Sequence, residues 1–387
     1  MRQKVAILGS TGSIGKTLLK IINNDKKKFE IKLLTANKNY KLLISQAIKF
    51  NVKNIIITDY KYYLKAKKLN KKNSIKIYKN FNHFEKIFKK KVDYTMSSII
   101  GLEGLLPTMK IIKYTKKIAI ANKEAIICGW NLIHKEIIKN KSIFIPVDSE
   151  HYSIWEILNS KYKTQIERIY ITASGGPFLN KSKKQIKNVK IHEALKHPNW
   201  KMGKKITIDS ATMMNKVFEV IETKNIFNVP YEKISILIHP KSYVHAIVKF
   251  KNGIIKILAH DTSMKIPIFN TLYHGTKKTI ISNSLSFKKL NELELELIKV
   301  KNFPSIKILN KLPHISSLFE TILVTSNDEF VKKFLLKKIK FNQITHNLSK
   351  FLKNKEFQKY KRLKPKKIQD IIELSEYVRL KLNTLSI

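Results

Sequence analysis

Cysteine is nearly absent from this chain of 387 residues, since Cys128 is the only one. An internal disulfide is therefore excluded, and the neighbouring Ile126 and Ile127 predict a packed thiol rather than a reactive one. Long apolar runs are also lacking, so the sequence offers neither a membrane span nor a signal-type stretch near Met1. We expect a soluble, cytoplasmic protein.

Acidic residues are scarce, with 28 Asp and Glu against 76 Lys and Arg, which gives a net charge of +48. Such an excess is typical of proteins that bind nucleic acids. The lysines are nevertheless spread through the whole chain, and they are enriched together with Ile and Asn, as drift toward A- and T-rich codons would produce. We therefore expect no specific nucleic-acid partner; a nucleic-acid-binding protein with a decayed enzyme fold is the alternative.

The length exceeds one compact core, and the apolar pattern divides the chain into four parts. Residues 1–148 alternate short apolar runs with helical stretches, which predicts a doubly wound, Rossmann-like α/β domain. Residues 149–275 mix longer strand-like runs with helices and predict an α+β domain. Residues 276–304 form a connecting segment, and residues 305–387 predict a small all-α domain. There an apolar stripe contains Ile371, Leu374, Val378, Leu382 and Leu385.

A glycine-rich turn follows the first predicted strand. Gly9, Gly12 and Gly15 stand in a GxxGxxG spacing just before a helical run, which is the context of a phosphate-binding turn. A plain tight turn is the alternative. The second predicted strand ends at Asn37, Lys38 and Asn39, with no acidic residue to hold the ribose hydroxyls of NAD, so NADP is favoured.

Two carboxylates stand at the end of the first predicted domain. Asp148 and Glu150 follow the apolar strand 142–146, and an extended Asp-x-Glu places both side chains on one face of the chain. Hard oxygen ligands of this kind suit Mg²⁺ or Mn²⁺. The pattern predicts half of a metal site, with an exposed acidic turn as the alternative.

A polar stripe is predicted on a helix that begins at Asp209 or Ser210 as its cap. The stripe contains Thr212, Asn215, Lys216 and Glu219, which recur at helical spacing. Donors near the amino-terminal end suit a phosphate, and Glu219 one turn further on suits a metal; a solvated face is the alternative.

Two further segments could contact a substrate. Residues 196–203 combine Pro and Gly with Trp200, which suggests a lid, although the indole could equally anchor a loop in the core. Residues 174–177, Ser-Gly-Gly-Pro, form a turn of small residues in which the backbone could hold an anion.

With these motifs in order, the chain resembles the 1-deoxy-D-xylulose 5-phosphate reductoisomerase family over essentially its whole length. The motifs are GSTGSIG at 9–15, ANKE at 121–124, PVDSEH at 146–151, SGGPF at 174–178, HPNWKMG at 197–203, DSATMMNK at 209–216 and LIHP at 237–240. The family implies an NADPH- and divalent-metal-dependent homodimer. It isomerises a ketose phosphate to a branched aldehyde phosphate and reduces that to 2-C-methyl-D-erythritol 4-phosphate.

The resemblance also implies roles for single residues. The cofactor would contact Thr11, Gly12, Ser13, Ile14, Asn37, Lys38, Asn39, Asn122, Glu124, Met202 and Gly203. Asp148, Glu150 and Glu219 would bind Mg²⁺ or Mn²⁺. The substrate would contact Lys123, Ser149, Glu150, Ser174, His197, Trp200, Ser210, Asn215, Lys216 and Glu219. Lys123, Glu150 and His197 are the expected catalytic residues, the first two for proton transfer.

The chain departs from the family pattern in three places. Val217 stands where glycine is expected, Lys241 replaces a glutamine, and residues 259–264 diverge from a stretch that usually contains glycine. These departures leave the expected activity class intact. An NADP-dependent semialdehyde or alcohol dehydrogenase is a rival reading, which predicts no need for the three carboxylates.

Overall fold

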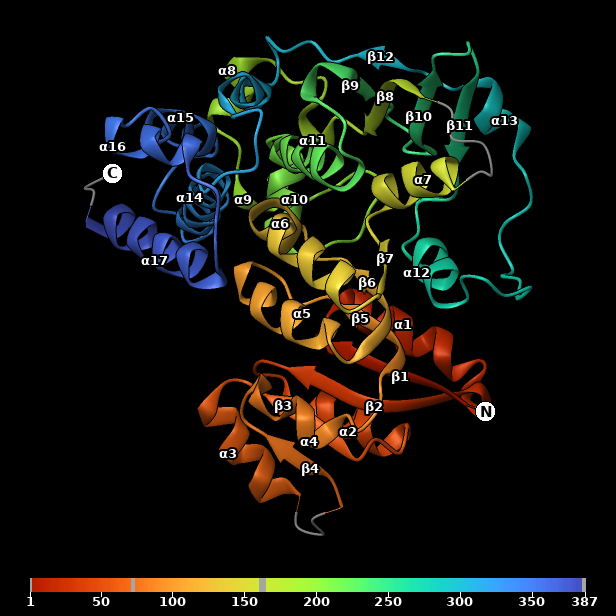
Figure 1. Ribbon diagram of the computed structural model, residues 1–387. Helices are drawn as coiled ribbons and strands as arrows, with labels where there is room; N and C mark the ends of the chain where they lie inside the picture. Colours follow the sequence, from red (N-terminus) through yellow and green to blue (C-terminus); the bar gives the residue numbers. More distant parts are fainter. Residues whose placement is uncertain (1, 71–73, 160–164, 385–387) are drawn as a thin grey trace. The chain divides into compact units, whose positions relative to one another are not determined.

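The computed structural model describes residues 2–70, 74–159 and 165–384, which form two compact units (Figure 1). The first unit consists of residues 1–125, 132–148 and 264–280, and the second of residues 126–131, 149–263 and 281–387. The predicted division at 148, 275 and 304 stays a prediction. Among the described residues, no helix combines the length and apolar character that crossing a membrane requires.

The first unit is built on a seven-stranded parallel sheet in the order β4-β3-β2-β1-β5-β6-β7 (Figure 1). The strands are β1 (Gln3–Leu8), β2 (Phe29–Ala36), β3 (Asn54–Ile57), β4 (Lys76–Tyr78), β5 (Val92–Ser97), β6 (Thr115–Ile120) and β7 (Ile143–Pro146). The strand order reverses direction at β1, which pairs with both β2 and β5. The predicted doubly wound, Rossmann-like class is confirmed, and β4 is a strand that the apolar pattern missed.

Helices alternate with these strands. They are α1 (Ser13–Asn23), α2 (Tyr40–Lys49), α3 (Tyr60–Leu69), α4 (Phe84–Ile87), α5 (Leu105–Ile112) and α6 (Lys123–Lys139). A later helix, α12 (Lys265–Leu272), packs beside α1 in the same unit. Its Ile268 and Leu272 are buried in the core that Val5 and Leu18 also form, so the chain returns to the first unit long after it has left it.

The second unit contains a mixed five-stranded sheet in the order β11-β10-β8-β9-β12. The strands are β8 (Ile166–Ala173), β9 (Ile234–Ile238), β10 (Val244–Phe250), β11 (Ile255–Ala259) and β12 (Glu296–Leu297). Only the β8–β9 pair is parallel among the described pairings. Two helices, α7 (Ser149–Leu158) and α11 (Met214–Phe227), pack on this sheet and on each other. The expected α+β class is confirmed.

The remaining helices of the second unit are short in the middle of the chain and long at its end. They are α8 (Lys183–Lys187), α9 (Ile191–Ala194), α10 (Lys204–Ala211), α13 (Phe287–Asn291), α14 (Phe319–Leu335), α15 (Phe341–Phe351), α16 (Lys355–Gln358) and α17 (Ile368–Thr384). The last helix packs on α14. Of its predicted stripe, Ile371, Leu374, Val378 and Leu382 are buried, whereas Leu385 lies outside the described residues.

Two local predictions were wrong. Asp148-Ser149-Glu150 is not extended, because α7 begins at Ser149. Glu150 in its first turn favours the helix electrostatically, and the buried Ile154 and Ile157 hold it against the core. The helix predicted to begin near Ser210 is two helices, since Ser210 lies in α10 and Met213, with a φ of 63°, separates it from α11. A cap-like sequence therefore marks a bend between helices here.

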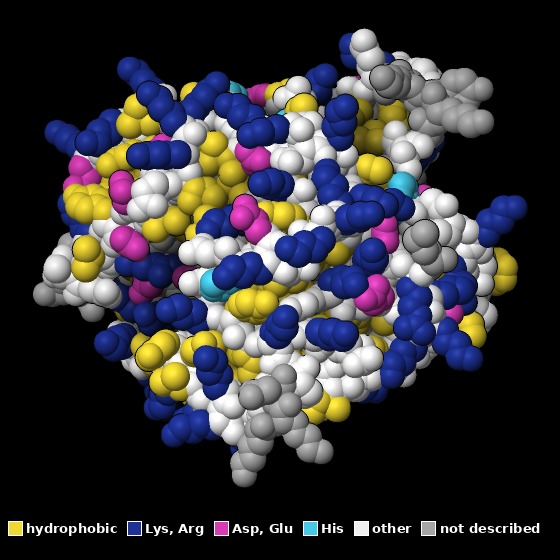
Figure 2. All heavy atoms as spheres, turned by 60° about the horizontal axis from the view of Figure 1, so that its bottom comes forward, with side chains coloured by type: hydrophobic (Ala, Val, Ile, Leu, Met, Phe, Trp, Pro, Cys, Tyr) yellow, Lys and Arg dark blue, Asp and Glu magenta, His cyan; other side chains and the backbone are white. Residues whose placement is uncertain are grey.

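Basic side chains are distributed over the surface without a single stripe on the face that Figure 2 shows. Lys and Arg lie among apolar side chains and a few acidic ones on that face. Long lysines can occupy such positions at low cost because their stems cover apolar surface while the ammonium groups stay in water.

Candidate functional site

Three carboxylates meet where α7 begins. Asp148, Glu150 and Glu219 each offer an oxygen within 4.8 Å of the others. Glu150 lies in the first turn of α7 and Glu219 on α11, both in the second unit. Asp148 ends the 132–148 segment of the first unit, and its peptide bond to Ser149 holds it at the start of α7. The predicted metal ligands therefore converge.

The chemistry of this donor set fits a hard divalent cation. Carboxylate oxygens are the preferred ligands of Mg²⁺ and Mn²⁺, and three of them leave positions for substrate and water. Oxygens that bind one Mg²⁺ lie about 2.1 Å from it, hence no more than about 4.2 Å apart. The three carboxylate oxygens lie within 4.8 Å of one another, which is close to this limit.

Two lysines neutralise most of this negative charge. Lys123, at the start of α6, forms an ion pair with Asp148. Lys216 lies 2.8 Å from Glu150 Oε1, is paired with Glu219, and donates to the carbonyl oxygen of Thr172 at 2.6 Å. Burial opposes the charged form of Lys216, but Glu150 and Glu219 outweigh it and raise the pKa of the ammonium group.

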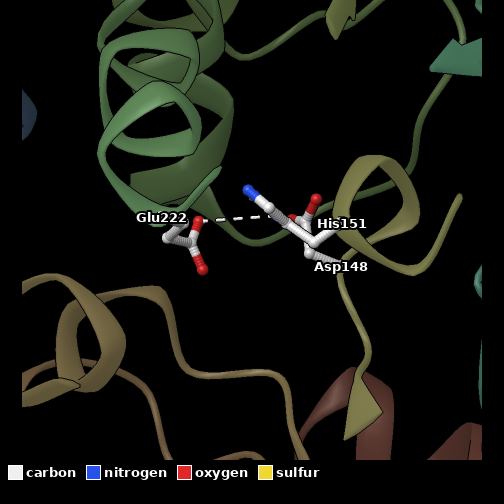
Figure 3. A group of neighbouring side chains, drawn as sticks. All are labelled: Asp148, His151 and Glu222. Carbon is white, nitrogen blue, oxygen red and sulfur yellow. Dashed lines mark ion pairs between the residues drawn. The ribbon is translucent and has the colours of Figure 1, made fainter. Parts of the chain in front are cut away.

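His151 and Glu222 lie beside Asp148, and sequence reasoning missed both residues (Figure 3). His151 on α7 lies 3.9 Å from Glu222 Oε2 on α11, and together with Asp148 these residues form an overlapping group of possible ligands. The Nε2 of His151 lies 3.0 Å from the carbonyl oxygen of Glu219, so Nε2 carries the proton and the ring holds the backbone of a metal ligand. Their spacing of three residues from Asp148 and Glu219 was the available signal.

The predicted phosphate residues come from the turn after β8, from α10 and from α11. Asn215 donates to Glu219 Oε1 on the same face of α11, and its Oδ1 is buried without a hydrogen-bond partner among the described residues. Ser174 begins the small-residue turn, where Gly176 has a φ of 69°. A Cβ on Gly176 would lie 3.0 Å from the carbonyl oxygen of Ser210, so this turn packs closely against the end of α10. Ser174, Ser210, Asn215 and Lys216 thus share one region of the second unit.

The predicted lid is tied to this turn through His197. The Nδ1 of His197 accepts from the backbone N–H groups of Asn199 and Trp200 at 3.1 and 3.0 Å. The proton therefore resides on Nε2, which lies 3.3 Å from the hydroxyl of Ser174. Burial lowers the pKa of His197 to about 4, and the nearby Lys216 adds to this effect. His197 is a neutral donor at physiological pH.

Trp200 is half-buried and lies beside His245, one of a stacked pair of histidines that sequence reasoning also missed. Its ring lies 6.1 Å from that of His245 in an edge arrangement, and the ring of His245 stacks on His260 at 3.8 Å. Burial lowers the pKa of His245 to about 3, with His260 contributing. The divergence of residues 259–264 from the family pattern could have drawn attention to His260. His245 lies on the buried strand β10, and its sequence context gave no such signal.

The glycine turn of the first unit has the geometry of a phosphate-binding loop. Gly9 has a φ of 84°, and a Cβ on Gly15 would lie 2.5 Å from the Cα of Ser10, so side chains are excluded at both positions. Helix α1 begins at Ser13 with Gly12 as its cap residue and no side-chain cap, which leaves its first N–H groups for an anion. Thr11, Gly12, Ser13 and Ile14 all lie at this turn.

Other predicted cofactor residues have structural roles of their own. Asn37 donates to Thr58 at 2.8 Å, Asn39 caps α2, and Asn122 donates to the carbonyl oxygen of Gly101 at 2.8 Å. Lys38 is exposed, and Glu124 is buried in the first turn of α6. Met202 and Gly203 belong to the second unit, where Gly203 is the cap residue of α10.

Comparison with known proteins assigns the chain to a family. Three family models match: 1-deoxy-D-xylulose 5-phosphate reductoisomerase at residues 5–129, its C-terminal domain at 144–227, and the DXP reductoisomerase C-terminal domain at 260–381. The reductoisomerase of Pelagibacter ubique is 57% identical over 387 residues, covering 100% of both chains. That of Clostridium tetani is 37% identical over 390 residues, covering 98% of this chain and 100% of the relative.

The chain belongs to the 1-deoxy-D-xylulose 5-phosphate reductoisomerase family. Among solved structures, the enzyme of Zymomonas mobilis in complex with NADPH has a TM-score of 0.87 at 30% identity, covering 100% of both chains. A DOX-P reductoisomerase in complex with NADPH, fosmidomycin and magnesium has a TM-score of 0.90 at 29% identity and covers 98% of this chain and 97% of that one. The suspected family resemblance is confirmed.

The departures from the reductoisomerase pattern are accommodated locally. Val217 is fully buried on α11, on the side away from solvent. Lys241 forms an ion pair with Glu292, and His260 donates through Nδ1 to the carbonyl oxygen of Asp261 at 2.7 Å. None of the three replaces a predicted metal ligand.

Proposed function

We propose that this chain converts 1-deoxy-D-xylulose 5-phosphate to 2-C-methyl-D-erythritol 4-phosphate with NADPH and a divalent cation, in non-mevalonate isoprenoid biosynthesis. The convergence of Asp148, Glu150 and Glu219 beside Lys216 carries this proposal. Full-length identity of 57% to a reductoisomerase supports it, as does the likeness to a structure that contains NADPH, fosmidomycin and magnesium. The dehydrogenase alternative has no use for three converging carboxylates.

Asp148, Glu150 and Glu219 would hold Mg²⁺ or Mn²⁺. A cation bound there supplies Lewis acidity toward the carbonyl and hydroxyl oxygens of the substrate. His151 keeps the backbone of Glu219 in place through its ring Nε2, and Glu222 faces the other side of the ring. Ser149, which donates to Glu150 at 2.6 Å, would contact a substrate oxygen.

Lys123 and Glu150 are the proposed groups for proton transfer. Lys123 forms an ion pair with Asp148, and Glu150 is bonded to Lys216, so each is held by an opposite charge at the point where the substrate's oxygens would bind.

Ser174, Ser210, Asn215 and Lys216 would bind the substrate phosphate. Lys216 supplies positive charge, and the hydroxyl and amide groups supply donors in a largely buried region. His197, neutral with its proton on Nε2, would donate in the same region, and Trp200 would cover the bound substrate and exclude water. Lys216 would then exchange part of its contact with Glu150 and Glu219 for the phosphate.

The turn that contains Thr11, Gly12, Ser13 and Ile14 would bind the pyrophosphate of NADPH. The exposed Lys38, with Asn37 and Asn39, would face the 2′-phosphate. Asn122 and Glu124 would lie nearer the reactive end of the cofactor, and Met202 and Gly203 would approach the nicotinamide.

We further propose a homodimer formed through the second unit's sheet. β11 is an edge strand, and Ile255 and Ile257 on it are 57% and 53% exposed. Exposed apolar side chains on a sheet edge favour pairing with a partner. Light scattering tests this, since a monomer at micromolar concentration would contradict it. The cytoplasmic location stays a prediction.

The activity is tested with purified protein, NADPH, 1-deoxy-D-xylulose 5-phosphate and Mg²⁺ or Mn²⁺. We expect NADPH oxidation only when all components are present, and a product identified by NMR as 2-C-methyl-D-erythritol 4-phosphate. Chelation of the metal should abolish turnover, and added Mn²⁺ should restore it. Absence of turnover with every component supplied would contradict the proposal. Oxidation that continues in the presence of a chelator would favour the dehydrogenase reading.

A further inference from the structure

A buried carboxylate next to the phosphate residues is held from a distant helix. Asp209 lies on α10 directly before Ser210 and is 1% exposed. Its Oδ1 accepts a hydrogen bond of 2.8 Å from the amide of Asn327, which lies fully buried on α14. Its Oδ2 lies 3.0 Å from the ammonium group of Lys205. The two residues that make the hydrogen bond are separated by 118 positions in the sequence.

Lys205 joins the same three helices. Its ammonium group also lies 3.0 Å from Asp328 on α14 and 5.1 Å from the centre of the Phe218 ring on α11. One lysine of α10 therefore contacts both α14 and α11. We call Lys205, Asp209, Asn327 and Asp328 the polar clasp. All four belong to the second unit.

Loss of one contact of the polar clasp would destabilise the folded protein. A buried carboxylate is unfavourable unless opposite charge and hydrogen bonds replace its water, and Asp209 has one of each. Hydrogen bonds and charged contacts also constrain direction, whereas apolar packing alone tolerates small sliding between helices. The clasp therefore fixes α10 in one position along α14.

The bend between α10 and α11 transmits this position to the site. Ser210 lies in the last turn of α10, and Asn215, Lys216 and Glu219 lie in the first two turns of α11, after Met213, whose φ is 63°. A non-glycine residue in this conformation persists only when its surroundings determine it. The clasp holds one side of the bend, and a hydrogen bond from Ser305 to the carbonyl oxygen of Thr212 holds its centre.

We propose that the polar clasp positions the phosphate-binding residues, so that α14 of the carboxyl-terminal helices takes part in substrate binding without touching the substrate. This inference rests on the proposed phosphate role of Ser210, Asn215 and Lys216. Asn327 and Asp209 are positioning residues in this proposal. Their effect should appear in the affinity for the phosphate group rather than in the binding of NADPH.

The test replaces Asn327 by Leu, which keeps the size of the side chain and removes the donor. We expect the KM for 1-deoxy-D-xylulose 5-phosphate and the inhibition constant of inorganic phosphate to rise together by about tenfold or more, as loss of a hydrogen bond to a charged group predicts. The dissociation constant of NADPH, measured by fluorescence, should change less than twofold. A double variant, Asp209→Asn with Asn327→Asp, exchanges the two partners and should restore most of the lost phosphate affinity.

Thr325→Val is the matched control. Thr325 lies two residues from Asn327 on α14, and its hydroxyl donates to Ser375 of α17 at 2.9 Å, away from α10. The control removes a buried hydrogen bond of the same helix and should lower Tm without changing KM. If Asn327→Leu lowers Tm and leaves both constants unchanged, as the control does, the clasp has only a structural role and the proposal is overturned.

Two further variants keep the result decisive. Asp328→Asn weakens only the more exposed arm of the clasp, so it should fold and raise both constants by a smaller factor; unchanged constants would count against the clasp. Ser210→Ala tests the underlying assignment. If Ser210→Ala raises KM and Asn327→Leu does not, the clasp fails alone. If neither changes KM or the inhibition by phosphate, the proposed phosphate site is wrong as well.

Discussion

The glycine turn before α1 and the carboxylate cluster at the start of α7 differ in how they are made. The turn is local: Gly9, Gly12 and Gly15 come from seven consecutive residues, and backbone groups at the start of α1 provide the binding capacity. The cluster combines Asp148 and Glu150 with Glu219, about seventy positions later, and its side chains are bound to lysines. The glycine turn depends on the absence of side chains that would collide with the backbone. The carboxylate cluster depends on lysines that balance its negative charge.

The largest expected effect removes charge from the cluster. Glu219→Gln keeps the shape of the side chain but loses one negative ligand, so we expect turnover to fall by about a thousandfold, as loss of metal assistance worth several kcal/mol predicts. NADPH affinity should stay within twofold of the unchanged protein, because the glycine turn does not depend on Glu219. Glu373→Gln, at an exposed position of α17, is the matched control. Equal turnover of both variants would contradict the metal assignment.

The next expected effect concerns Glu320, a buried carboxylate outside the cluster, whose negative charge should lower the stability of the protein. Burial raises the pKa of Glu320 to about 7, although Ser317 donates to it, so its charge is not fully compensated. Between pH 4.5 and about pH 7, Glu320 is protonated in the folded protein but ionised in the unfolded chain. The free energy of unfolding therefore falls as the pH rises through that window.

Glu320→Gln removes this pH dependence. The difference in unfolding free energy between the variant and the unchanged protein should be larger at pH 8 than at pH 5, by up to about 3 kcal/mol in favour of the variant. Urea unfolding at the two pH values measures the difference, with Glu373→Gln again as the control. A gain of the same size at both pH values would show that the proton of Glu320 is not responsible.

The local character of the turn is tested by Gly15→Ala. The added Cβ would meet the Cα of Ser10 at 2.5 Å and the carbonyl oxygen of Gly9 at 2.6 Å, both backbone atoms. We expect a loss of about 1 to 3 kcal/mol in stability and a weaker NADPH complex. Gly253→Ala is a useful contrast, because it has a positive φ of 83° but open space around its Cβ. If Gly15→Ala binds NADPH normally, the phosphate-binding reading of the turn is wrong.

The smallest expected effect concerns cofactor choice. Lys38 is exposed after β2, so its charge would add only about 1 kcal/mol to the binding of a 2′-phosphate. Lys38→Met should weaken NADPH about fivefold, leave NADH unchanged, and reduce the salt dependence of NADPH binding. An equal loss for both cofactors would place Lys38 away from the 2′-phosphate.

The two sites also differ in how well the sequence predicted them. The strand, glycine turn and helix at 3–23 follow from neighbouring residues, because positive φ and close backbone contact admit only glycine at Gly9 and Gly15. The acidic pair was found for a partly wrong reason, since Asp148 and Glu150 stand at a helix start and not on an extended strand. The bend at Met213 was missed, because its sequence has the composition of a helix cap.

The sequence by itself determined the fold class of both units, the glycine turn, and the residue types available to a metal and a phosphate. These depend on hydrophobic period, glycine sterics and side-chain chemistry, all of which are local. Only the tertiary structure decided that Glu219 reaches the start of α7, that His151 and Glu222 stand behind the cluster, that His245 stacks on His260, and that Asn327 holds Asp209. Contacts between residues far apart in sequence depend on how helices pack, and the spacing of residues along one helix does not determine which other helix it meets.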